Sequence, residues 1–379
     1  MVSPILKNLR VLGADELTPI YFKDDRIVLS NDGAALDQSG RLYDLNGSIV
    51  LPGFIDVHNH GAIGVDVNSA TADNLIKVGR FLATNGVTAW MPTLVPDSDD
   101  NYRRAIDAMY DVMSQQSELA VAQIVGVHYE GVFANEAMCG ALRPQYFKRF
   151  TGCEIESLPK LESGVHMTTL APEIDGGIEL IEQLVASNWL VSIGHTHADV
   201  GTLDLAFAAG ARHITHFFNA MTAIHHRNIG VAGWGLTHDE VTFDIIADGV
   251  HVVPEMLKLA VTSKGTDKVS LISDSVAPTG MGDGDYELWG ETVLVRKGRT
   301  QNERGSIAGS VITMIDAVKT MLNLGFSFDD IGQMTSTNPA KLLGLELERG
   351  SIADGKRADL VVMSNHGIIQ KVFVAGQLI

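Results

Sequence analysis

Eight short apolar segments recur through the middle of the chain, and stretches of helical length separate most of them. The helical stretches include 71–85, 99–114, 177–187, 201–209 and 254–263. Buried strands that alternate with helices form parallel sheets with right-handed crossovers, and eight such strands can close into a barrel. The sequence therefore predicts an α/β fold, a (β/α)8 TIM-like barrel, with strands at 48–57, 87–94, 124–128, 167–171, 189–193, 213–218, 242–247 and 268–272.

Both ends of the chain carry a different pattern, in which short alternating segments are separated by turn residues. Near the start, the turn residues are Asn31-Asp32-Gly33 and Ser39-Gly40, and the segments are 19–22, 26–30 and 41–45. Near the end, the segments are 359–363 and 370–375. Because chain termini often lie close together, we expect residues 1–50 and 349–379 to form one small β-domain beside a barrel of residues 51–348.

The charge balance argues against two classes of partner. Lys and Arg number 28 and Asp and Glu number 46, so the formal net charge is −18 at pH 7. A field of that sign repels nucleic-acid phosphates and anionic lipids. We therefore expect no nucleic acid and no membrane among the partners. An anionic small molecule would need positive contacts that are local to its site.

The sequence also favours a cytoplasmic location. Cys139 and Cys153 are the only cysteines, which is typical of a reducing compartment. Residues 1–10 lack a secretory signal pattern, and no apolar run approaches the length of about 18 residues that crosses a bilayer.

Polar side chains follow most of the predicted strands. Active sites of such barrels lie at the carboxyl ends of the strands. Six of the eight segments end in a histidine or a carboxylate, where packing alone would favour apolar residues. Imidazole and carboxylate are the ligands of a catalytic zinc-type ion that keeps one position open. The residues at these ends include His58, His60, Glu130, His195, His216, Asp248, His251 and Asp274.

A metal ion in this position would supply hydrolytic chemistry. Such an ion lowers the pKa of bound water to about 7 and polarises a carbonyl oxygen. Asp274 has no neighbouring partner in the sequence pattern, so we expect it to accept a proton from water and deliver it to a leaving nitrogen.

Longer motifs around these residues resemble the amidohydrolase superfamily. The motifs are LPGFIDVHNHG at 51–61, LISD at 271–274 and GKRADLV at 355–361. Within that superfamily, further segments closely resemble the N-acetylglucosamine-6-phosphate deacetylases, namely HYEG at 128–131, GHT at 194–196, THFFNAM at 215–221, ADGVH at 247–251 and IAGS at 307–310. The resemblance implies a barrel flanked by a β-sandwich, and hydrolysis of an acetamide on a phosphorylated amino sugar.

The resemblance also implies a role for each matching residue. Glu130, His195 and His216 would hold the principal metal, and Asp274 would act as general base and acid. His58 and His60 would hold a second metal with Glu130. The ion would be zinc, with iron, cobalt or manganese equally suited to these ligands, in one or two copies per chain.

Substrate contacts follow from the same comparison. His251 would lie near the acetyl carbonyl, and Arg227 would reach across the interface of a homodimer to the phosphate. The residues expected to bind substrate are Ala141, Leu142, Asn219, Ala220, Arg227, Asp248, Gly249, Val250, His251, Ile307, Ala308, Gly309 and Ser310.

Two positions depart from the family pattern. Val132 stands where proline is usual, which affects loop stiffness. Leu142 stands where many members have His or Gln, and leucine cannot donate a hydrogen bond. Either the preference for the acyl group or sugar differs here, or Arg143 substitutes for the missing donor.

Three alternatives to a glucosamine-specific enzyme remain. The sugar could be the galactosamine epimer, the enzyme could be an amide hydrolase with no need for phosphate, or the barrel could be a non-catalytic scaffold. The complete set of Glu130, His195, His216 and Asp274 argues against a scaffold.

We interpret the remaining nearby histidines as hydrogen-bonded or surface residues, and the tryptophans as packing residues. These are His128, His197, His213, His225 and His226, and Trp90, Trp189, Trp234 and Trp289.

Overall fold

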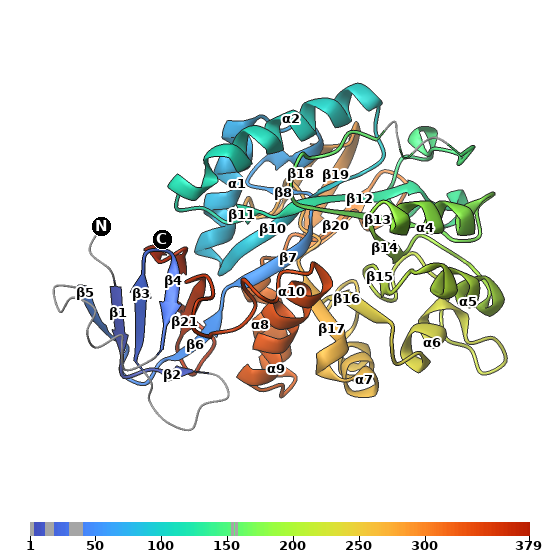
Figure 1. Ribbon diagram of the computed structural model, residues 1–379. Coiled ribbons are helices and arrows are strands. Elements are labelled where there is room, and N and C mark those ends of the chain that lie inside the picture. Colours follow the sequence, from blue (N-terminus) through green and yellow to red (C-terminus); the bar gives the residue numbers. More distant parts are fainter. Residues whose placement is uncertain (1–3, 12–18, 30–40, 153–154, 156–157) are drawn as a thin grey trace.

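The computed structural model describes residues 4–11, 19–29, 41–152, 155 and 158–379. A nine-stranded parallel sheet forms the centre of the molecule, in the order β11-β10-β12-β13-β14-β15-β16-β17 with β7 paired to β10 (Figure 1). The strands are β7 (Phe54–Asn59), β10 (Val87–Leu94), β11 (Gln123–Ile124), β12 (Gly126–Phe133), β13 (Val165–Leu170), β14 (Leu190–Ile193), β15 (His213–Ile214), β16 (Thr242–Ile246) and β17 (Val269–Ile272).

The first and last barrel strands meet at their carboxyl ends. The backbone N–H of Asp274 donates to the carbonyl of His58 at 3.0 Å, and the N–H of His60 donates to the carbonyl of Ser275 at 2.8 Å. Asn59 and Ser275 form a parallel bridge between these two segments. The sheet is therefore a nearly closed barrel, which confirms the predicted fold class.

Helices cover the outside of the barrel (Figure 1). Leu75, Val78 and Leu82 recur at helical spacing on the buried face of the first helix, and Thr71 caps its start. The helices are α1 (Ala72–Thr84), α2 (Asp99–Gln115), α4 (Gly177–Ala186), α5 (Val200–Ala209), α6 (Gly230–Thr237), α7 (Pro254–Lys264), α8 (Met314–Asn323), α9 (Phe328–Gly332) and α10 (Asn338–Leu342). Among the described residues, no helix has the length and apolar character needed to cross a membrane.

Two sheets built from both ends of the chain form a small second domain (Figure 1). One sheet has the order β4-β3-β1-β5 and the other has the order β2-β6-β21-β22-β23. They share one apolar core, in which Phe22 and Phe373 meet edge to face at 5.4 Å. The strands are β1 (Pro4–Lys7), β2 (Arg10–Val11), β3 (Ile20–Lys23), β4 (Arg26–Val28), β5 (Arg41–Asp44), β6 (Ile49–Pro52), β21 (Leu360–Met363), β22 (Ile369–Val374) and β23 (Gln377–Leu378).

One predicted strand is in fact two strands. The segment 48–57 contains β6, which pairs with β21 in the terminal domain, and the start of β7, which pairs with β10 in the barrel. The break falls at Gly53, where a Cβ atom would lie 2.1 Å from the hydroxyl oxygen of Thr88. The domain boundaries remain a prediction. The turns at 31–33 and 39–40 and the residue Cys153 lie outside the described residues.

A three-stranded antiparallel sheet follows the last barrel strand and was not predicted. It consists of β18 (Gly284–Leu288), β19 (Glu291–Arg296) and β20 (Arg299–Asn302). A short hairpin, β8 (Gly61–Ala62) and β9 (Val65–Asp66), follows the first barrel strand. Both insertions therefore begin at the carboxyl end of the barrel.

Candidate active site

A cavity of about 290 Å³ opens among the loops at the carboxyl ends of the barrel strands. Ligand pockets of soluble proteins have volumes of roughly 300 Å³ and above. The cavity is lined by His60, Glu130, Gly140, Ala141, Leu142, His195, His216, Asn219, Ala220, His251, Asp274, Trp289, Ser306, Ile307 and Gly309.

One group of potential metal ligands consists of Glu130, His195 and His216. The Oε1 atom of Glu130 lies 3.1 Å from Nε2 of His195 and 3.0 Å from Nε2 of His216. The two imidazole Nε2 atoms are 3.0 Å apart. All three side chains are buried; Glu130 lies within β12, and His195 and His216 each lie two residues beyond the end of β14 and β15.

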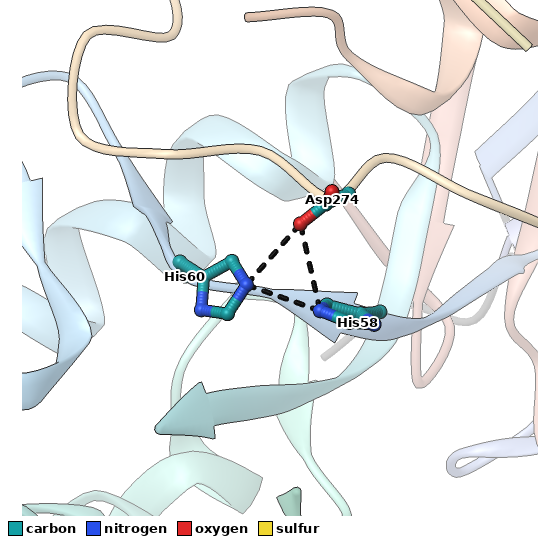
Figure 2. A group of neighbouring side chains, drawn as sticks. All are labelled: His58, His60 and Asp274. Carbon is teal, nitrogen blue, oxygen red and sulfur yellow. Dashed lines mark hydrogen bonds and ion pairs between the residues drawn. The ribbon is translucent and has the colours of Figure 1, made fainter. Parts of the chain in front are cut away.

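A second group consists of His58, His60 and Asp274. Figure 2 shows a carboxylate oxygen of Asp274 pointing at both imidazoles, at 3.5 Å from Nε2 of His58 and 3.2 Å from Nε2 of His60. Glu130 lies between the groups, because its carboxylate is 3.5 Å from His58 and 3.2 Å from His60. Barrel closure therefore brings Asp274 against the first strand, a contact that the sequence pattern does not show.

The hydrogen bonds of two imidazoles fix which nitrogen faces the groups. Nδ1 of His195 is 2.9 Å from the carbonyl oxygen of Met138, and Nδ1 of His60 is 3.0 Å from that of Thr93. A carbonyl oxygen only accepts, so each Nδ1 carries the proton and, in a neutral ring, each Nε2 presents a lone pair. Lone pairs and carboxylate oxygens that converge in this way fit a divalent cation.

Both carboxyl groups are held in the charged form. Burial alone raises the pKa of Glu130, but the surrounding imidazoles, His58 first among them, outweigh it and lower the pKa well below its usual range. At Asp274, burial raises the pKa and the imidazole of His58 lowers it, and the net result is a lowered pKa. Carboxylates are the protonation state that binds cations.

Three of these residues have left-handed backbone conformations. The φ angles are +48° at His195, +34° at His216 and +49° at Asp274. Each residue lies two positions beyond the last residue of its strand. Such a conformation costs an L-residue roughly 1–2 kcal/mol, so surrounding contacts must hold it. At Asp274, the backbone N–H bonds to His58 and the carbonyl accepts from Ser310 at 2.7 Å.

The predicted substrate residues divide into two sets. Ala141, Leu142, Asn219, Ala220, His251, Ile307 and Gly309 line the cavity. Asp248 lies behind His251, accepting from its Nδ1 at 2.6 Å and from its backbone N–H at 2.8 Å. In the described structure, Asp248, Gly249, Val250, Ala308, Ser310 and Arg227 are outside this lining. Arg227 is exposed, with Nη1 2.6 Å from Nε2 of His226.

Two interpretations of the sequence are corrected at this site. Arg143 does not replace the donor missing at Leu142, because it is not among the residues that line the cavity and its Nη2 bonds to the carbonyl of Pro96 and to Asp97, both at 2.8 Å. Trp289 is more than a packing residue, because it lines the cavity with its ring 5.4 Å from that of His60. None of the recognised motifs contains Trp289, which lies at the turn between β18 and β19.

The other histidines behave as predicted. Nε2 of His128 bonds to Oγ1 of Thr169 at 2.7 Å, and Nδ1 of His213 bonds to Oγ1 of Thr242 at 2.7 Å, both in the core. His197, His225 and His226 are exposed.

Comparison with known proteins identifies the family. The model of the amidohydrolase family matches residues 49–379, which is most of the chain. The chain belongs to the amidohydrolase family.

Individual relatives are more specific. This amidohydrolase is 38% identical over 322 residues to N-acetylglucosamine-6-phosphate deacetylase of Bacillus subtilis, covering 84% of this chain and 81% of the relative. It is 32% identical over 335 residues to N-acetylgalactosamine-6-phosphate deacetylase of Escherichia coli O157:H7, covering 88% of each chain.

A solved structure extends the likeness to the whole fold. It is an Asp-to-Ala variant of N-acetyl-D-glucosamine-6-phosphate deacetylase from Mycobacterium smegmatis, in complex with N-acetyl-D-glucosamine-6-phosphate. The TM-score is 0.88 at 30% identity, with 100% of this chain and 99% of the other chain covered. The family and the buried imidazoles and carboxylates of this amidohydrolase are together compatible with a divalent metal site.

The two groups of ligands predict the metal content. We expect fully loaded protein to contain up to two ions per chain, and the double substitution His58→Ala and His60→Ala to lower the content to one, because it removes two ligands of one group only. Elemental analysis of purified protein measures this content. The matched control, His251→Ala, should leave the content unchanged, since His251 belongs to neither group. An unchanged content in the double variant would remove the second metal from the site.

Proposed function

We propose that this amidohydrolase removes the acetyl group of N-acetylglucosamine 6-phosphate, giving glucosamine 6-phosphate and acetate. The observation that carries the proposal is the position of Asp274, whose carboxylate is 3.2 Å from His60 in a cavity that Glu130, His195 and His216 also line. This cavity combines a proton acceptor with a cation-binding centre. Relatives with this activity cover most of the chain, which supports the choice of substrate.

The hydrolysis requires one proton transfer in each direction. When bound, a divalent ion supplies Lewis acidity that polarises the acyl carbonyl and acidifies water. Asp274 accepts a proton as the oxygen of water bonds to the carbonyl carbon. It then donates that proton to the amide nitrogen as the carbon–nitrogen bond breaks, and the second proton of water passes from the carboxylic acid to the amine, so acetate and the ammonium form of the sugar leave. The lowered pKa of Asp274 keeps it ready to accept the proton.

His251 orients the acyl group. Nδ1 of His251 donates to Asp248 at 2.6 Å, because an ionised carboxylate can only accept hydrogen bonds. That bond fixes the orientation of the ring. Since His251 lines the cavity, we assign it a position near the acetyl carbonyl.

The phosphate needs a positive partner that the net charge of −18 cannot provide. Arg227 is exposed and lies outside the cavity lining of its own chain, so we assign it to the phosphate of the neighbouring subunit in a homodimer. A guanidinium offers two parallel hydrogen bonds to phosphate oxygens. Asn219 and Ala220 line the cavity, and we assign them to the sugar phosphate.

Two further details of the proposal are the identity of the metal ion and the cellular compartment. We assign zinc as the ion, with iron, cobalt or manganese as the alternatives that imidazole and carboxylate accept. We assign the enzyme to the cytoplasm, the compartment that supplies phosphorylated sugars.

A second candidate substrate is N-acetylgalactosamine 6-phosphate. The relative from Escherichia coli O157:H7 that carries this name is 32% identical to the chain. Leu142 also removes one possible hydrogen-bond donor to the substrate. A third candidate is an amide hydrolase that needs no phosphate.

An assay of amine release tests all three candidates. We expect metal-loaded protein to act on N-acetylglucosamine 6-phosphate with a higher kcat/KM than on the galactosamine epimer, and far better than on either sugar without phosphate. A higher kcat/KM for the epimer would reassign the sugar. Equal rates with and without phosphate would contradict the phosphate site, and no release from any of the sugars would contradict the deacetylase.

Substitution of Asp274 tests its role in proton transfer. Asp274→Asn keeps the size of the side chain and a ligand oxygen but cannot accept a proton. We expect kcat to fall by about 10²- to 10⁴-fold while metal content and KM change little. Steady-state kinetics and elemental analysis measure these three quantities. A variant with nearly unchanged kcat would transfer the role of base to another group, with His251 the next candidate.

Mixed dimers test the assignment of Arg227. We expect Arg227→Ala to raise KM for the phosphorylated sugar much more than for the unphosphorylated sugar, whereas the exposed Arg103→Ala on α2 should change neither. Mixing Arg227→Ala chains with Asp274→Asn chains should restore part of the activity, since one site per heterodimer then holds both an intact Asp274 and a donated Arg227. Verified heterodimers without such rescue would exclude donation across the interface.

A further inference from the structure

One side of the catalytic cavity is apolar. Leu142 is 3% exposed and packs with Val95 and Ala134, and Trp289 packs against the same cluster. Ala141 and Trp289 also pack against a second apolar cluster that contains Leu288. We call Ala141, Leu142 and Trp289 the apolar wall, and all three line the cavity.

Trp289 has a backbone conformation that suits tryptophan poorly. It follows Leu288 at the turn between β18 and β19, with φ +55°, and the next residue, Gly290, has φ +80°. Turns with two left-handed residues favour Asn and Gly, because a bulky side chain is strained there. Strain of this kind persists where the side chain has a task. The position of Trp289 therefore points to a use for its ring.

The ring of Trp289 is fixed beside one of the predicted metal ligands. Its Nε1 donates to Oδ1 of Asp66 at 3.3 Å, and its ring meets that of His60 edge to face at 5.4 Å. The hydrogen bond occupies the single polar group of the indole, so the rest of the ring offers only apolar surface to the cavity. The wall thus lies directly beside the predicted metal centre.

Leu142 and Ala141 are held in place by the same inserted sheet. Arg304, just beyond β20, donates from Nη2 to the carbonyl of Ala141 at 2.9 Å and to that of Leu142 at 3.2 Å. Its Nε lies 3.2 Å from Glu291 on β19. The apolar wall therefore combines two loops that one arginine ties together.

The position of the wall indicates which part of the substrate it meets. His60 and Leu142 follow β7 and β12, whereas Asn219, Ala220 and His251 follow β15 and β16, across the mouth of the barrel. An amide is planar and trans, so its two carbon substituents extend in opposite directions. With the carbonyl at the metal centre and the sugar toward Asn219, the alkyl part of the acyl group extends toward Trp289.

We propose that Trp289 and Leu142 form the acyl pocket of this enzyme and restrict it to short, unsubstituted alkyl groups such as the methyl of an acetyl group. This inference rests on the proposed function and adds the acyl specificity to it. A longer alkyl chain would collide with the indole ring and the leucine side chain. A hydroxyl group would lose its water without gaining a hydrogen-bond partner from the wall.

Acyl selectivity of two variants tests the pocket. The substrates are the N-acetyl, N-propionyl and N-glycolyl forms of the preferred hexosamine 6-phosphate, and the readout is the ratio of kcat/KM for each form to that for N-acetyl. We expect Trp289→Ala and Leu142→Ala each to raise the propionyl ratio by about tenfold or more, as one methylene in an apolar pocket changes the rate by 10- to 200-fold. The glycolyl ratio should rise as water enters the enlarged pocket.

A matched control separates the wall from the rest of the cavity. Ile307→Ala removes a similar volume from a residue that lines the cavity but does not belong to the apolar wall, so it should lower kcat/KM for all three substrates alike and leave both ratios unchanged. Trp289→Phe keeps an aromatic ring with less volume, and we expect an intermediate propionyl ratio. If Trp289→Ala does not fold, Trp289→Phe and Leu142→Ala still test the pocket.

Each outcome distinguishes the pocket from the proposed function. If the unmodified protein releases amine from none of the acyl sugars, the deacetylase proposal fails. If it acts on the N-acetyl form while the wall variants keep the original ratios, the acyl pocket is excluded and the deacetylase stands. An equal fall of kcat/KM for all three substrates would also exclude the pocket, and would assign Trp289 to the support of His60 or to the sugar.

Discussion

The hydrogen bonds that join the first and last strands of the barrel hold the catalytic centre together. The N–H of Asp274 donates to the carbonyl of His58, and the N–H of His60 donates to that of Ser275. The side chain of Asn59, between the two histidines, reinforces this seam through Ser273 at 3.2 Å and Ser275 at 2.8 Å. Residues more than 200 positions apart thus meet because the sheet closes. The same bonds complete the fold and bring the proposed base to the proposed ligands.

The two buried carboxylates of the centre need positive charge or hydrogen-bond donors to compensate them. Glu130 and Asp274 are both ionised there, among four imidazoles, inside a chain whose net charge is already −18. Two buried carboxylates destabilise a folded protein unless cations or strong donors compensate them. Divalent ions would compensate the carboxylates while neutral imidazoles fill the remaining positions. Metal binding at this centre would therefore increase folding stability.

The sequence predicted the barrel and singled out the candidate ligands because both leave local signals. Strands buried on both faces read as continuous apolar runs, and a polar residue that ends such a run is conspicuous. The helix α6 was missed because Gly230, Gly233 and Gly235 weaken its helical pattern. The break at Gly53 and the wall at Trp289 depend on contacts with residues distant in sequence, so no local pattern reveals them. The pairing of Asp274 is likewise a property of the closed barrel.

The left-handed backbone at His195, His216 and Asp274 has a consequence for how this barrel can change. Glycine or asparagine would relax the backbone at each position, so selection for stability alone favours losing all three side chains. Selection for hydrolysis opposes that drift at the same three positions. Protein engineering that relieves backbone strain to raise stability would substitute these positions early. The product would be a more stable barrel that lacks two candidate metal ligands and the proposed base.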